Sequence, residues 1–84
     1  MDAPAITFSP EATAEHLRGL QASADLIGSL IASNERTPEA LDTMDRNVRH
    51  LEIMLSMSHI QAAGADLSPY EAAITAGKAW LAAS

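Results

Sequence analysis

The chain has 84 residues, a net charge of −6 and no cysteine. Its 11 acidic residues against five basic ones disfavour binding to nucleic acid or to an anionic membrane, and the lack of cysteine excludes disulfides and thiolate–metal sites. Because 17 of its hydrophobic residues are alanine, the core is thin, and small domains of this kind often complete their core by oligomerising.

The start of the chain has neither the basic nor the apolar region of a signal peptide. No apolar run approaches the roughly 20 residues that cross a bilayer. We therefore expect a cytoplasmic protein that does not enter a membrane. Residues 1–8 are expected to form an irregular arm.

Three Ser/Thr-Pro steps mark the starts of three helices. Ser9, Thr37 and Ser68 each place a hydroxyl where it can accept a hydrogen bond from a first helical turn, and the proline that follows has no N–H to leave unpaired. Ser68 is also expected to form a capping box with Glu71. The sequence therefore predicts an all-α fold, with a single three-helix domain over residues 9–84 and helices over about 10–34, 38–63 and 69–83.

The two longer helices are predicted to form an antiparallel hairpin, because only a short link separates them. Each carries apolar residues at alternating spacings of four and three, the pattern of a buried helix face. On the solvent side of the second helix, Asp42–Arg46 and Asp45–Arg49 are expected to form ion pairs. The two faces comprise Thr13, Leu17, Leu20, Ala24, Ile27 and Ile31 in the first helix and Leu41, Met44, Val48, Leu51, Leu55 and Ala62 in the second.

The second helix has a further apolar face, formed by Ile53, Met57 and Ile60 and almost opposite the first. A helix that is apolar on two sides is expected to be covered on both. The third helix, at about 15 residues and about 22 Å, is too short to cover the whole hairpin, so either it or a second copy of the chain covers this face. The residues predicted for an interaction surface are Leu26, Leu30, Ile53, Met54, Met57, Ile60 and Trp80.

The three histidines are the only side chains that titrate near neutral pH. His16, His50 and His59 lack the Glu-x-x-His spacing of a di-iron bundle and any zinc-ligand spacing, so no metal or other cofactor is expected. His16 lies between two apolar stripes and is expected to be half-buried with a hydrogen-bond partner. No nucleophile elbow or glycine-rich phosphate loop is present, and we expect no catalytic residues and no enzyme activity.

Small residues recur every four positions in the first helix, at Ala24, Gly28 and Ala32. In a membrane this spacing favours helix dimerisation. Charged residues stand close to it in this chain, so we interpret it as a place of close packing within the domain.

The sequence favours a non-catalytic helical module for protein–protein interaction, with self-association into a homodimer through the apolar surface of the second and third helices. The alternative is a small acidic regulator or inhibitor, of the accessory or mobile-element (phage) type, that binds a basic surface of a larger protein. Salt dependence separates the two, because acidic docking weakens with ionic strength. A histidine–carboxylate metal protein is a third and weaker hypothesis.

Overall fold

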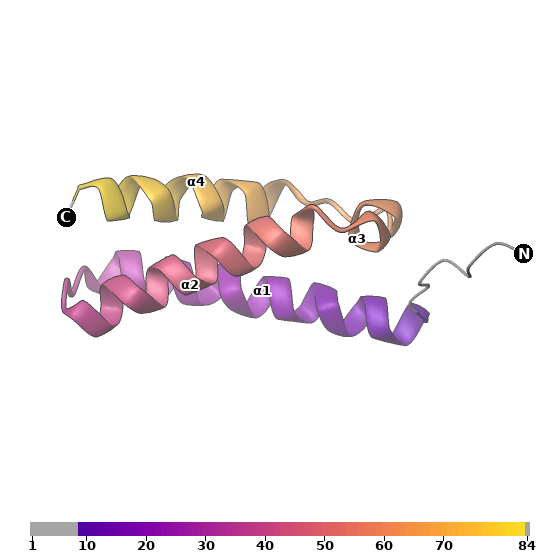
Figure 1. The fold of residues 1–84 in the computed structure, drawn as a ribbon, viewed down its shortest axis with the longest axis horizontal. Helices are drawn as coiled ribbons and strands as arrows, with labels where there is room; N and C mark the ends of the chain where they lie inside the picture. The colour runs from indigo at the N-terminus through magenta and orange to yellow at the C-terminus, as the bar shows by residue number, and fades with distance from the viewer. Residues whose placement is uncertain (1–8, 84) are drawn as a thin grey trace, which may run out of the picture.

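The structure is a computed structural model, and residues 9–83 are described. These residues form four helices and no strand, so the predicted all-α fold is confirmed (Figure 1). The expected arm over residues 1–8 lies outside the described residues, as does residue 84. The helices are α1 (Pro10–Ser33), α2 (Pro38–Leu55), α3 (Ser58–Ala62) and α4 (Ser68–Ala82).

The two long helices, α1 and α2, run antiparallel, and α4 lies along both of them (Figure 1). The carboxyl end of α4 reaches the α1–α2 turn, whereas α3 lies at the opposite end of α2. The last helix therefore packs on its own chain. It fills the groove of the hairpin and leaves the outer side of α2 uncovered within this chain.

All three predicted helix starts lie within one residue of the observed ones, and two of the three predicted caps are confirmed. The Ser9 hydroxyl accepts a hydrogen bond from the Ala12 N–H at 3.1 Å, and the Thr37 hydroxyl accepts one from the Ala40 N–H at 3.1 Å. Asn34 ends α1 in the left-handed region, with φ 50°, which asparagine tolerates better than most residues. These local contacts set the positions of both long helices along the chain.

The predicted capping box at Ser68 is wrong. Ser68 is already the first residue of α4, and its hydroxyl donates a 2.7 Å hydrogen bond to Asp66 Oδ1. The Ser68 N–H donates to the same oxygen at 3.1 Å. A carboxylate is a stronger acceptor than a hydroxyl, so Asp66 takes the role that the sequence pattern gave to Ser68.

The helix predicted over 38–63 is interrupted at Ser56 and Met57. The Ser56 hydroxyl donates to the Ile53 carbonyl at 2.6 Å, and Met57 is extended, with φ −78° and ψ 134°. An unbroken helix would place Ile60 beside Ile53 on the outer face, because seven residues make almost two full turns. The break instead turns Ile60 into the core, where its side chain is fully buried, and this burial contributes about 1.5–3 kcal/mol.

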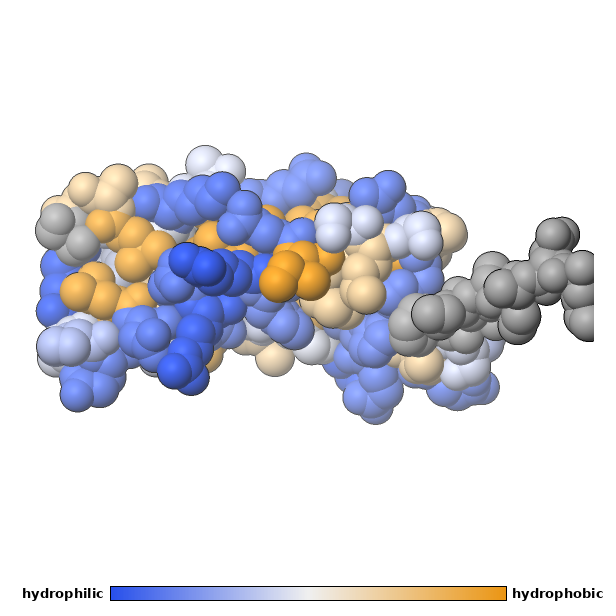
Figure 2. Space-filling model, in the orientation of Figure 1, coloured by the Kyte–Doolittle hydropathy of each residue, from blue (hydrophilic) through white to orange (hydrophobic). Residues whose placement is uncertain are grey.

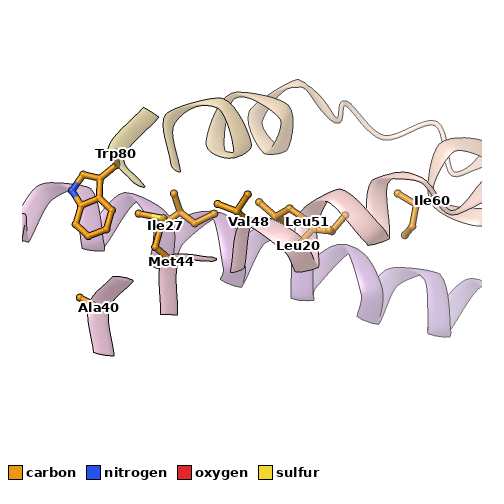
Figure 3. Close-up of a cluster of buried hydrophobic side chains, with 8 residues drawn as sticks. All are labelled: Leu20, Ile27, Ala40, Met44, Val48, Leu51, Ile60 and Trp80. Atoms are coloured by element: carbon orange, nitrogen blue, oxygen red, sulfur yellow. The ribbon is translucent and has the colours of Figure 1, made fainter. Parts of the chain in front are cut away.

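The core is a single line of apolar side chains between the helices (Figure 3). Trp80 closes it at the end near the α1–α2 turn, and Ile60 closes it at the end near α3. Leu20 and Ile27 from α1 face α2, as their spacing predicts. Within residues 9–83, the buried hydrophobic side chains are those of Leu20, Ile27, Ala40, Met44, Val48, Leu51, Ile60 and Trp80.

Candidate functional site

The seven residues predicted for an interaction surface differ widely in burial. Ile53 is 62% exposed, Leu26 40% and Met57 37%. Leu30 and Met54 are half-buried and pack against the core. Ile60 and Trp80 are buried in the core of a single chain, so their predicted place on an interaction surface is wrong.

Trp80 is withdrawn from the surface by contacts with the α1–α2 turn. Its indole N–H donates to Asn34 Oδ1 at 3.1 Å, and the Arg36 guanidinium lies 4.3 Å from the ring centroid. Arg36 also donates to the Trp80 carbonyl at 2.8 Å and to Asn34 Oδ1 at 3.1 Å. The indole therefore has a polar partner and a cation on its face, which fixes the carboxyl end of α4 on the turn.

Ile53 and Met57 are the exposed apolar side chains on the outer side of the α2–α3 segment, and we call them the outer apolar surface. Figure 2 shows an apolar area over the carboxyl-terminal half of α2, with hydrophilic side chains beside it. The ion pair between Lys78 and Glu52, at 2.8 Å, joins α4 to α2 next to Ile53 in sequence. An apolar centre with charged neighbours is the composition of a small protein interface.

Every basic side chain of the chain has an acidic or aromatic partner within it. The predicted Asp42–Arg46 and Asp45–Arg49 pairs are confirmed, at 2.9 and 3.0 Å, and Arg18 pairs with Glu15. Lys78 is held by Glu52 and Arg36 by Trp80. Within residues 9–83, the carboxylates that form no ion pair are Glu11, Asp25, Glu35, Glu39, Asp66 and Glu71.

Two histidines from distant parts of the chain meet between α1 and α3. His16 Nδ1 lies 2.8 Å from His59 Nε2, and the rings are edge-to-face with centroids 5.0 Å apart. Both side chains are half-buried, which confirms the prediction that His16 is half-buried with a hydrogen-bond partner, whereas His50 is exposed. An N–H···N bond requires one facing nitrogen to donate and the other to accept, so the tautomers of the two rings must be complementary in this geometry.

Sequence reasoning missed this pairing, because the two histidines are 43 positions apart and share no ligand spacing. A signal was nevertheless available. In an antiparallel hairpin with its turn at 34–37, positions close to 55–59 lie opposite position 16. In the part of the chain that the structure describes, no group of three or more His, Asp or Glu side chains is arranged to hold a metal ion.

The close packing expected at Ala24, Gly28 and Ala32 is not found. Gly28 is exposed, and a Cβ built on it would have no atom within 4 Å. The close approach of helices occurs instead at Gly77 of α4, where a Cβ would lie 2.6 Å from Val48 Cγ2. The spacing of small residues in α1 therefore did not predict where helices pack closely, because the buried Gly77 of α4 allows the close approach instead.

No match was found in comparisons with models of known protein families, with curated proteins or with solved structures. None of the helices within residues 9–83 is both long enough and apolar enough to cross a membrane.

Proposed function

We propose that this chain is a non-catalytic helical module for protein–protein interaction in the cytoplasm, and that it self-associates into a homodimer through the outer apolar surface. The observation that carries the proposal is the 62% exposure of Ile53 on the side of α2 that faces away from the core. The surface proposed here is smaller than the sequence predicted, because Ile60 and Trp80 already serve the core of one chain.

The chemistry of the outer apolar surface suits a self-complementary contact. In a twofold dimer the same patch is buried on both copies, so Ile53 and Met57 each contribute twice. Full burial of such a side chain is worth about 1.5–3 kcal/mol relative to leaving it exposed. Methionine is flexible and fits irregular partner surfaces. Eight apolar side chains are buried within residues 9–83, and in so small a core the burial of two more side chains per copy is a substantial gain.

Solution mass measurements on Ile53→Asp and Met57→Asp test the dimer. Light scattering behind a sizing column is expected to give the mass of two chains for the natural protein and of one chain for either variant, because an aspartate would be desolvated at the interface. Met57→Asp is expected to stay folded, since Met57 precedes α3 with extended dihedral angles and forms no side-chain cap, a position that aspartate favours.

Ser29→Asp is the matched control, because it adds the same charge at an exposed position of α1. It is expected to leave the mass of two chains unchanged. A natural protein that runs as a single chain at every concentration would contradict self-association. A dimer that withstands both Ile53→Asp and Met57→Asp would contradict the assigned surface.

The distribution of charge favours a second candidate function, an acidic regulator or inhibitor of the accessory or mobile-element type. All five basic side chains are held by partners within the chain, so the six carboxylates without ion pairs in residues 9–83 present an excess of negative charge. Such a protein would bind a lysine-rich peptide, with an affinity that falls steeply as salt is raised. A dimer held by Ile53 and Met57 would be nearly insensitive to the same change in salt.

A further inference from the structure

The methionines of the chain differ sharply in burial. Within residues 9–83, Met44 is fully buried, Met54 is half-buried against the core, and Met57 is 37% exposed. The chain has no cysteine, so the methionines are its only sulfur-containing side chains. We propose that Met57 is an oxidation site, at which hydrogen peroxide converts the thioether into a sulfoxide, and that this modification separates the dimer. The proposal rests on the proposed function, because it concerns regulation of the outer apolar surface.

The modification is the transfer of one oxygen atom to the sulfur of Met57. A sulfur lone pair attacks one peroxide oxygen, the O–O bond breaks as the S–O bond forms, and the proton of the attacked oxygen moves to the other oxygen, which leaves as water. The thioether is thereby oxidised by two electrons, and these electrons reduce the peroxide. Methionine sulfoxide reductases reverse the change, with thiols as the reductant, so that the modification can act as a switch.

The position of Met57 between α2 and α3 gives peroxide access to its sulfur without unfolding. The Met57 N–H donates to the Met54 carbonyl at 3.1 Å, and the Met57 carbonyl accepts from the Gln61 N–H at 3.2 Å. These bonds fix the backbone while the side chain is on the outer side of the bundle. Met44 is protected by contrast, because α4 covers it: a Cβ at Gly77 would lie 3.1 Å from Met44 Sδ. Oxidation of the folded chain is therefore expected to favour Met57.

A sulfoxide at Met57 would place a polar S–O group in a surface that the dimer buries. The other member of that surface, Ile53, has no hydrogen-bond donor in its side chain, and burial of a polar group without a hydrogen bond is unfavourable. In a twofold dimer the sulfoxides of both chains are buried in the same interface. We therefore expect the dissociation constant to rise at least about tenfold, which corresponds to about 1.4 kcal/mol.

The same coupling protects Met57 from oxidation in the dimer. The sulfur is exposed in the separated chain and covered in the dimer, so the rate of sulfoxide formation should fall as the protein concentration rises through the dissociation constant. In Ile53→Asp, which is expected to be a single chain, this rate should not depend on protein concentration.

Peroxide treatment of the full chain tests the proposal, with peptide mass mapping to locate the sulfoxide and light scattering to measure the dissociation constant. We expect Met57 to be oxidised before Met44, the dissociation constant to rise at least about tenfold, and methionine sulfoxide reductase with a dithiol to reverse the rise. Met57→Leu has a side chain of similar volume that cannot form a sulfoxide. Compared with its own untreated sample, this variant should show no rise.

Met54→Leu is the matched control, because it removes a methionine that is half-buried against the core. It is expected to respond to peroxide as the natural chain does. An unchanged dissociation constant after Met57 is oxidised would overturn the regulation alone. An equal response in Met57→Leu, or oxidation of Met57 no faster than that of Met44, would overturn the assigned site. An untreated natural chain that is single at every concentration would overturn the dimer and its regulation together, so the untreated sample distinguishes the two failures.

Discussion

Gly77 is the residue at which α4 comes closest to the hairpin. A Cβ at this position would lie 2.6 Å from Val48 Cγ2, 3.1 Å from Met44 Sδ and 3.5 Å from Ile27 Cγ2. Val48 is buried, and its branched side chain has few alternative rotamers, so it cannot easily move aside. The absence of a side chain at Gly77 therefore sets how closely α4 packs on α1 and α2.

Gly77→Ala is expected to destabilise the fold. Overpacking a core costs about 1–3 kcal/mol, and the better helix propensity of alanine offsets about 1 kcal/mol of this. We expect the free energy of unfolding, measured by urea denaturation, to fall by up to about 2 kcal/mol.

Gly19→Ala is the control, since a Cβ at Gly19 of α1 would have no atom within 4 Å. Because the substitution changes helix propensity without a steric clash, it is expected to raise the free energy of unfolding by about 0.5–1 kcal/mol. If both substitutions stabilise the protein equally, α4 does not pack as closely at Gly77 as the structure indicates.

The residues that sequence analysis predicted correctly depend on close neighbours in the chain. Ser9 and Thr37 cap their helices through the N–H three positions later, so the pattern is visible in four consecutive residues. The close approach of Gly77 to Val48 was not visible in the sequence, because it depends on how two helices dock.

At the scale of elements, the start of α4 depends on the carboxylate of Asp66. Hydrogen bonds from the Ser68 hydroxyl and the Ser68 N–H favour its charged form and lower the pKa of Asp66 below the usual 3.8. A lowered pKa in the folded state adds stability above the pKa of the unfolded state. This contribution is lost as the pH falls through the folded-state pKa.

Asp66→Asn is therefore expected to weaken the loss of stability on acidification. Asparagine retains an acceptor oxygen but does not titrate. Between pH 5 and pH 2, the unfolding temperature measured by circular dichroism should fall further for the natural protein than for the variant. Ser68→Ala removes the stronger donor and should reduce the same slope in part. Identical pH profiles for all three proteins would show that the contact does not form in solution.

The elements that sequence analysis placed wrongly depend on contacts between distant segments. The apolar period continues from α2 through Met57 to Ile60, so a single helix over 38–63 was the expected result. The break at Ser56 and Met57 is favoured because it buries Ile60. The free energy of this burial depends on contacts of α3 with α1 and α2, which a local sequence pattern does not contain. The proximity of His16 and His59 follows from the same break. The sequence pattern did not predict it, because the break depends on contacts between distant segments.

For the molecule as a whole, the line of buried side chains implies that stability is uneven along the bundle. Met44, Val48 and Leu51 lie in the middle, between α1 and α4. At one end, α3 has five residues and contributes only Ile60 to the buried core. Helices of this length are not stable alone, so α3 depends on Ile60 and on the His16–His59 contact.

We therefore expect α3 to open without unfolding the rest of the bundle. In native-state hydrogen exchange, the amides of Val48 and Leu51 should exchange with the global free energy of unfolding, about 4–12 kcal/mol for a chain of this length. The amide of Gln61, in α3, should exchange at least about 100-fold faster, because local opening exposes only a few residues. Ile60→Val would lower the protection of Gln61 more than that of Val48. Equal protection at both positions would mean that α3 unfolds only together with α2. The break at Met57 would then change the direction of the chain without making α3 a separately opening unit.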